Sequence, residues 1–166
     1  MPDDARSNVN AFQACLRAPF ATLGITTTEN HVTGLRFRAP AVPAMAPRKN
    51  SLAFLACVQI QSYLENGRFE FDLPLRLSGT HHQLEVWEAM QRIPAGEMRT
   101  YGDLAHDIKS SARAVGGACG ANPIPLVVPC HRVIAANRAI GGFMGQRGEG
   151  FELSIKRWLL EHEGAF

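Results

Sequence analysis

Pro129-Cys130-His131 is the segment of this chain whose residue types most directly suggest chemistry. The thiolate is the reactive form of cysteine, and a neighbouring imidazole is the commonest means of producing it at neutral pH. The preceding proline restricts the backbone, and Leu126-Val127-Val128 just before it are strand-forming residues. We therefore predict a nucleophilic Cys130 at the end of a strand, activated by His131.

The other three cysteines, Cys15, Cys57 and Cys119, are widely scattered and form no CxxC pair. This spacing argues against a zinc site and against a disulfide framework. Cys57 lies among apolar residues and Cys119 among small ones, so we expect both to be packed in the core.

The composition is that of a globular protein, with 46% apolar and 19% charged residues in a chain of 166. That length fits one or two small domains. No apolar run approaches the roughly 20 residues that span a bilayer, and the acidic start Met1–Asp4 does not resemble a signal peptide. We expect a cytoplasmic, nucleoid-associated protein without a membrane partner. The net charge of +2 does not by itself indicate a nucleic-acid partner.

A first module, residues 1–77, has the pattern of a small α/β scaffold. Two β-prone stretches, Leu23–Thr27 and Val32–Phe37, predict a hairpin. A helix over 52–66 follows, and residues 69–77 suggest an edge strand interrupted by Pro74. Asn50-Ser51 caps that helix, whose expected apolar stripe is Leu52, Leu55, Ala56, Ile60, Tyr63 and Leu64.

A second module, residues 78–166, is mostly helical. Thr80 and Gln83 form a predicted capping box for a helix that buries Leu84, Trp87 and Met90. Two short helices follow, Tyr101 to about Ile108 and about Ser111 to Gly120, and their brief connection predicts a helix-turn-helix.

The second helix of this pair is built mainly from small residues, such as Ala112 and Gly116. Composition alone favours tight packing against another helix. Arg113, a single long cation on this bare helix, favours insertion into the minor groove by a protein that displaces a base.

The rest of the module supplies a loop and a helix that could complete a site. Gly141–Gly145 can approach a ligand closely, although a plain turn fits it equally well. A final helix over 153–163 carries Lys156 and Glu163 two turns apart, so both can face one pocket, with exposed surface charge as the alternative.

Taken in order, these motifs resemble the bacterial O6-alkylguanine-DNA alkyltransferases, also called methylated-DNA–protein-cysteine methyltransferases. The resemblance is strong over residues 79–166 and implies a winged-helix-like domain with a helix-turn-helix. Phe71–Leu75 and Pro19–Gly24 resemble the family's N-terminal domain, which implies a ribonuclease-H-like α/β fold for residues 1–77. The motifs that carry the resemblance are Val86-Trp87, Ile93-Pro94, Gly96-Glu97, Thr100-Tyr101, Ala112–Gly116, Asn122-Pro123, Pro129–Val133, Trp158–Leu160 and His162–Gly164.

The resemblance implies DNA repair by direct damage reversal, with double-stranded DNA carrying alkylated guanine as partner and with no cofactor or metal. Cys130 would accept the alkyl group, and His131 would relay its proton through water to Glu163. Asn122 would brace the active-site turn, with Lys156 near the pocket. The product is a thioether, which has no carbonyl for water to attack, so each molecule should act once. Activity on O4-alkylthymine and cooperative assembly of monomers on DNA stay open.

The resemblance also implies how the flipped guanine is read. The hydroxyl of Tyr101 would serve a ring nitrogen, and the amide of Met144 would bond the guanine oxygen. Carbonyls of Cys130 and Val133 would accept hydrogen bonds from the amino group.

DNA contacts are implied for the helix-turn-helix. Arg113 would fill the place that the flipped base leaves in the stack. Ala112, Ala114 and Gly116 would contact the DNA backbone, and Thr100 is a further implied DNA contact.

The chain departs from the family pattern at several positions. His82 stands where phenylalanine is usual, and the connection 109–111 is shorter and lacks its glycine. Phe143, which the resemblance places against the substrate, replaces a common tyrosine, and Met144-Gly145-Gln146 replaces smaller residues.

Two other functions fit part of the pattern. A lesion-binding protein without repair activity would lack the acceptor cysteine, which is present. A thiol hydrolase would have its cysteine and histidine far apart in sequence, with an Asn or Asp partner.

Overall fold

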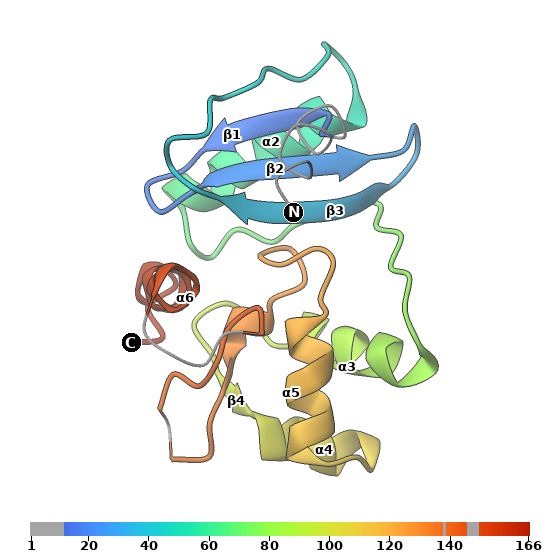
Figure 1. Ribbon diagram of the computed structural model, residues 1–166, viewed down its shortest axis with the longest axis vertical. Coiled ribbons are helices and arrows are strands. Elements are labelled where there is room, and N and C mark those ends of the chain that lie inside the picture. Colours follow the sequence, from blue (N-terminus) through green and yellow to red (C-terminus); the bar gives the residue numbers. More distant parts are fainter. Residues whose placement is uncertain (1–11, 138, 146–149) are drawn as a thin grey trace, which may run out of the picture. The chain divides into compact units, whose positions relative to one another are not determined.

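The computed structural model describes residues 12–137, 139–145 and 150–166. It divides into two compact units (Figure 1). The first contains the chain up to Glu65 together with Phe71–Arg76, and the second contains Asn66–Glu70 and Leu77–Phe166. The short segment 66–70 thus groups with the second unit, although it precedes residue 77 in the chain.

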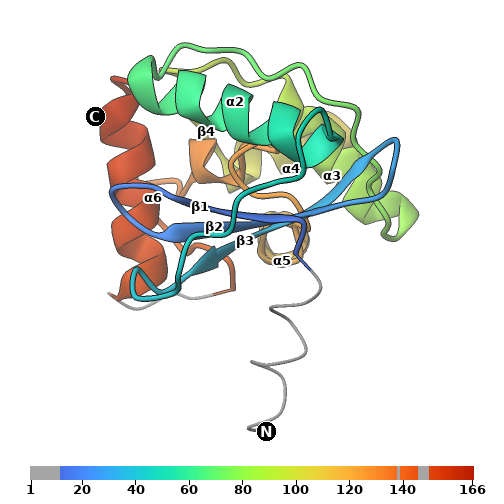
Figure 2. The ribbon, with the colours of Figure 1, turned by 90° about the horizontal axis from the view of Figure 1, so that it is seen from above.

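The first unit is a three-stranded antiparallel sheet with one helix on it. The strands pair in the order β1-β2-β3, with Leu23 opposite Phe37 and Ile25 opposite Leu35. Helix α2 lies along one face of the sheet (Figure 2). The elements are β1 Ala14–Arg17, β2 Thr22–Thr27, β3 Val32–Arg38 and α2 Leu52–Glu65. The hairpin prediction is confirmed, whereas β1 was not predicted because Ala-Cys-Leu-Arg has little strand propensity of its own.

Helix α2 begins where the sequence predicts, because Ser51 Oγ accepts a hydrogen bond from the amide of Phe54 at 3.2 Å. Its buried face differs from the predicted stripe, since Leu55 is 43% exposed. Small residues allow the helix to approach the sheet closely, and the buried side chains are Ala53, Ala56, Cys57, Ile60 and Tyr63.

The prediction of an edge strand over 69–77 is wrong. Leu75 makes a single parallel bridge to Val32, through bonds from the Val32 amide to the Pro74 carbonyl and from the Arg76 amide to the Val32 carbonyl. Pro74 has no amide hydrogen and cannot extend a ladder.

The second unit packs its helices around a core that includes Trp87, Met90, Leu104 and Val115. Its two short strands pair in parallel, with Arg99 opposite Val133. The elements are α3 His81–Gln91, β4 Arg99–Thr100, α4 Tyr101–Ile108, α5 Ala112–Gly120, the 3-10 turn η1 Cys130–Arg132, β5 Val133–Ile134 and α6 Phe151–His162.

The predicted helix starts of this unit are confirmed. Thr80 and Gln83 form a complete capping box on α3, and Thr100 and Asp103 form one on α4. Leu84 was expected in the core but is 38% exposed.

The fold is thus a mixed α/β arrangement in two units. Within the part of the chain that the structure describes, no helix is long and apolar enough to cross a membrane.

Candidate active site

The segment that leads to Cys130 is a tight turn, so the prediction of a strand over 126–128 is wrong. Leu126 has a φ of 76°, and the amide of Val128 donates to the carbonyl of Ile124 at 2.9 Å. Asn122 holds the turn: its Nδ2 donates to the Val128 carbonyl at 2.8 Å and its Oδ1 accepts from the Ile124 amide at 3.0 Å. These bonds outweigh the local preference of Leu-Val-Val for extended backbone.

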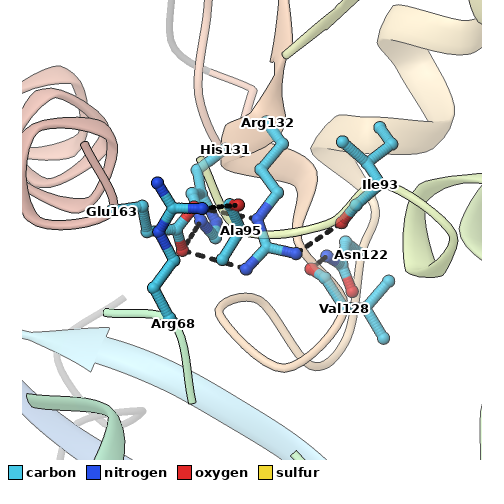
Figure 3. A network of polar contacts seen from close by, with 8 residues as sticks. All are labelled: Arg68, Ile93, Ala95, Asn122, Val128, His131, Arg132 and Glu163. Carbon is cyan, nitrogen blue, oxygen red and sulfur yellow. Dashed lines mark hydrogen bonds and ion pairs between the residues drawn. The ribbon is translucent and has the colours of Figure 1, made fainter. Parts of the chain in front are cut away.

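Cys130 begins a 3-10 turn and is buried, as is the side chain of His131. Glu163, at the end of α6, accepts hydrogen bonds from the side chains of His131 and Arg132 (Figure 3). His131 Nε2 lies 2.8 Å from Glu163 Oε2, so the two side chains pair directly and not through the water that was expected between them. Arg132 donates two hydrogen bonds to the same carboxylate, from Nε to Oε1 at 2.9 Å and from Nη2 to Oε2 at 3.0 Å.

The electrostatics of this cluster favour a charged Glu163 and a neutral His131. Burial raises the pKa of Glu163, but hydrogen bonds and charges from His131 and Arg132 outweigh it, so the net pKa is lowered. Burial is the main cause that lowers the pKa of His131, opposed by Glu163 and assisted by the positive charge of Arg132.

A neutral His131 beside an ionised Glu163 has a defined tautomer. The carboxylate only accepts hydrogen bonds, so Nε2 of the imidazole must donate to it. Nδ1 is then an unprotonated acceptor, and it is buried without a hydrogen-bond partner among the described residues. The arrangement leaves one basic nitrogen on the residue that follows the cysteine in the chain.

The thiol of Cys130 is protonated in the free protein. Burial raises its pKa to about 11, although the side chain of Asn122 and the charge of Lys156 act in the opposite direction. The sequence had suggested that the adjacent His131 would make Cys130 a thiolate in the resting protein. The raised pKa of the thiol argues against this. A base must take the proton when the thiol reacts.

Lys156 is fully buried and ties the active-site loop to β5. Its Nζ donates to the carbonyl of Val133 at 2.6 Å and to that of Gly142 at 2.8 Å. The ammonium lies 5.7 Å from the ring centroid of Tyr101, whose hydroxyl donates to the same Gly142 carbonyl at 3.3 Å. Burial lowers the pKa of Lys156 to about 8, with Cys130 and Cys119 opposing the shift.

A cavity of about 1240 Å³ opens above Cys130. Helix α5 forms one wall and the loop 139–145 forms another, and Tyr101 and Leu153 also line it. The aromatic and aliphatic side chains of the lining can contact the faces of a planar ring, and its glycines allow such a ring to approach the backbone closely. The lining includes Arg113, Gly116, Gly117, Cys130, Phe143 and Met144.

A family model, described as the DNA-binding domain of 6-O-methylguanine DNA methyltransferase, matches residues 81–165. The chain belongs to this family. The inducible methylated-DNA–protein-cysteine methyltransferase of Bacillus subtilis is 46% identical over 108 residues, 64% of this chain and 57% of that protein. The methylated-DNA–protein-cysteine methyltransferase of Mycolicibacterium paratuberculosis is 47% identical over 100 residues, 58% of this chain and 61% of that protein. The matched part of the chain thus spans about three fifths of the length of these curated relatives.

Solved alkyltransferase structures match over more of the chain. The crystal structure of Mycobacterium tuberculosis OGT in complex with DNA superposes with a TM-score of 0.74 at 36% identity. It covers 91% of each chain. The O6-methylguanine-DNA methyltransferase of Pyrococcus kodakaraensis gives a TM-score of 0.62 at 26% identity, over 90% of this chain and 96% of that one.

The interpretation that the small residues of α5 pack against another helix holds for Ala118, which is buried, and is wrong for the exposed Ala112, Ala114 and Gly117. Val115, Ala118 and Cys119 are buried. At Gly116 and Gly117, by contrast, no heavy atom of the described residues outside the adjacent residues and the local helix backbone lies within 4 Å of the place a Cβ would take. The small residues leave a bare surface, as the alkyltransferase resemblance implies for a helix that contacts DNA.

The helix-turn-helix connection achieves its turn without glycine. Lys109 takes a left-handed conformation, with a φ of 56°, where glycine is usual. The amide of Ser110 then donates to the carbonyl of Ala105 at 2.8 Å, and Ser111 Oγ accepts from the amide of Ala114 at 3.1 Å. The first bond closes α4 and the second starts α5.

The structure brings most of the predicted alkyltransferase site together. Seven of the predicted residues border the cavity, and five others lie behind it or hold its walls. Those on the cavity are Tyr101, Ala112, Arg113, Gly116, Cys130, Phe143 and Met144. Those behind it are Asn122, His131, Val133, Lys156 and Glu163.

Two predicted DNA contacts lie outside the cavity lining. Ala114 is exposed on α5. Thr100 is half-buried and caps α4, so its hydroxyl already accepts from the Asp103 amide at 3.0 Å.

Arg132 is the functional candidate to which the sequence analysis gave no role. It is buried, and beyond Glu163 its Nη1 donates to the carbonyl of Ile93 at 2.5 Å. The signal that could have found it was its place inside the Pro129–Val133 motif. Cys119, predicted to be a packing residue, is buried with its Sγ 3.6 Å from Met90 Sδ.

Proposed function

We propose that this protein repairs DNA by transferring an alkyl group from the O6 position of guanine, in duplex DNA, irreversibly to Sγ of Cys130. It would be a methylated-DNA–protein-cysteine methyltransferase that acts once per molecule. The observation that carries the proposal is a buried thiol at a cavity large enough to admit a guanine base, in a chain where the next residue, His131, pairs with the carboxylate of Glu163. The exposed face of α5, which carries Arg113, lines the same cavity. The names of the relatives point to the same reaction.

In the proposed transfer, the Cys130 proton moves through water to Nδ1 of His131, the nitrogen that the tautomer leaves unprotonated. The charge of Glu163 then stabilises the imidazolium, and Arg132 keeps Glu163 ionised and oriented. The thiolate bonds to the alkyl carbon as the carbon–O6 bond breaks. The electron pair of the broken carbon–O6 bond stays on guanine, and guanine takes up a proton in place of the alkyl group.

Guanine would be held by groups around the same cavity. The amide of Met144 and the hydroxyl of Tyr101 are the proposed donors to O6 and to a ring nitrogen. The carbonyls of Cys130 and Val133 are the proposed acceptors for the amino group. The Val133 carbonyl already accepts from Lys156, so guanine would use its second lone pair.

DNA would be engaged through its minor groove by α5, with Ala112, Ala114 and Gly116 near the backbone and Thr100 at the edge of the contact. Flipping a base costs a few kcal/mol, less for a poorly paired lesion. Arg113, exposed on α5 at the cavity, would offset part of this cost by entering the stack. The alkyl donor is the DNA itself, so the reaction needs no cofactor.

We further propose a ribonuclease-H-like class for residues 1–77 and a winged-helix-like class for residues 78–166. An antiparallel sheet covered by a helix supports the first. The second is supported by the mutual packing of α3, α4 and α5, of which α4 and α5 form the helix-turn-helix. A chromosomal substrate would place the protein with the nucleoid. The possible action on O4-alkylthymine and cooperative binding along DNA belong to the same proposal.

A stoichiometry experiment tests the proposed function. Excess duplex carrying labelled O6-methylguanine is mixed with a known amount of protein, and the label transferred to protein is counted over time. The proposal predicts one burst equal to the protein concentration and no further turnover. Repeated turnover, or loss of label to water, would support a thiol hydrolase instead. Binding of the lesion without transfer would indicate a protein that only recognises it.

A further inference from the structure

His82, near the start of α3, is hydrogen-bonded to the helix-turn-helix connection. Its Nε2 lies 2.8 Å from Oγ of Ser110, and both side chains are partly buried. The two residues are 28 positions apart in sequence, so this is a tertiary tie between α3 and the turn that joins α4 to α5.

The tie has a counterpart at the other end of α5. Nε1 of the buried Trp87 donates to the carbonyl of Ala118 at 2.8 Å. Helix α3 therefore holds α5 at two points, one just before its first residue and one in its last turn. Between them lies the bare surface around Arg113, Gly116 and Gly117.

The first of these points is where α5 most needs support. Lys109 stands in a left-handed conformation that is unfavourable for a residue with a side chain. Ser110 follows it, and Ser111, the next residue, caps α5. Holding the Ser110 side chain therefore fixes the backbone between the strained residue and the first turn of α5.

We propose that His82 and Ser110 are positioning residues that fix the angle at which α5 and Arg113 meet DNA. The inference rests on the proposed function. Phenylalanine, which the resemblance to the alkyltransferases leads us to expect at position 82, could pack against the turn but could not bond to Ser110. In this chain the His82–Ser110 hydrogen bond fixes the conformation of the connection between α4 and α5, which is short and has no glycine.

The experiment measures single-turnover rate constants on two substrates, duplex DNA with O6-methylguanine and free O6-benzylguanine. The proteins are the wild type, His82→Phe, Ser110→Ala and the double variant. Losing one such hydrogen bond should lower the duplex rate constant about fivefold, and the free-base rate constant less than twofold. The double variant should be no slower than either single variant, because both remove the same bond.

Two further variants separate positioning from general stability. His81→Phe changes the neighbouring histidine, which is exposed and, among the described residues, pairs with the partly exposed Glu85, and it should leave both rates unchanged. His82→Gln keeps an amide nitrogen near the place of Nε2 and should recover most of the duplex rate. Thermal unfolding of every variant identifies any that are not folded at the assay temperature.

Three outcomes would overturn the inference: equal losses on both substrates, additive losses in the double variant, or an unchanged duplex rate in folded His82→Phe. Failure of the proposed function looks different, because the wild type would then transfer alkyl groups from neither substrate.

Discussion

Arg132 holds Glu163 through two parallel bonds, Nε to Oε1 at 2.9 Å and Nη2 to Oε2 at 3.0 Å, in a buried site. This bidentate geometry fixes the carboxylate plane and leaves Oε2 shared with His131. Arg132 thus orients the carboxylate of Glu163, which the sequence analysis had already paired with His131. Three consecutive residues, Cys130 to Arg132, supply the proposed nucleophile, the base and the group that orients the base's partner.

Replacing Glu163 by Gln should slow alkyl transfer by about a hundredfold or more, because Nε2 of His131 would no longer be compelled to carry the proton. It should also lower the free energy of unfolding by about 3–5 kcal/mol, since Arg132 becomes an unpaired buried charge. Single-turnover kinetics with free O6-benzylguanine and urea denaturation measure the two effects. A variant as fast as the wild type would remove the carboxylate from the mechanism.

The stability difference between the wild type and Glu163→Gln should depend on pH. The pKa of Glu163 is lower in the folded protein than its unfolded value of about 4.3. Its contribution is therefore fully present above that value and is lost as the pH falls through the folded pKa. Denaturation curves should show a smaller difference in free energy of unfolding between the two proteins below pH 4 than at neutral pH. A difference that is the same at both pH values would mean that the folded and unfolded pKa values of Glu163 are equal.

The rate of transfer should be nearly flat around pH 7. Burial lowers the pKa of His131, so the imidazole is neutral there and becomes protonated only below its ordinary value of about 6.5. A rate profile with free O6-benzylguanine should fall only on that acidic side. If Cys130 instead ionised unaided, the rate would climb about tenfold per pH unit towards the thiol pKa of about 11.

Lys109→Gly should stabilise the protein by about 0.5–1 kcal/mol. Relief of the left-handed backbone at Lys109 is worth about 1–2 kcal/mol, part of which is offset by the greater freedom of glycine when unfolded. Lys109→Ala removes the same side chain without relieving the backbone, so it is the matched control. Urea midpoints compare the variants, and equal midpoints for Gly and Ala would contradict strain at this position.

Arg113→Ala should weaken repair of duplex DNA far more than reaction with the free base. The side chain is exposed on α5 and lies at the cavity, so it can assist the flipping of a base but is not part of the proton relay. Rate constants on both substrates test this. Equal losses on the two substrates would remove the inserted-arginine role.

Predictions from the sequence succeeded where the determining interactions are local. Thr80, Ser51 and Thr100 begin their helices because each caps a backbone amide within three residues. They failed where distant groups decide. Residues 124–128 form a turn because Asn122 bonds to Ile124 at one end and to Val128 at the other. The exposed face of α5 could not be distinguished from a packed one by composition. The role of Arg132 depends on α6 ending beside it, which no spacing in the sequence reveals.

The most direct test of the central claim is intact-protein mass spectrometry after mixing with duplex DNA carrying O6-methylguanine. The account predicts a mass gain of one methyl group per protein molecule, located on Cys130 by peptide mapping and absent from Cys130→Ser. An unmodified Cys130 alongside an unrepaired lesion, or a methyl group on a different residue, would contradict it.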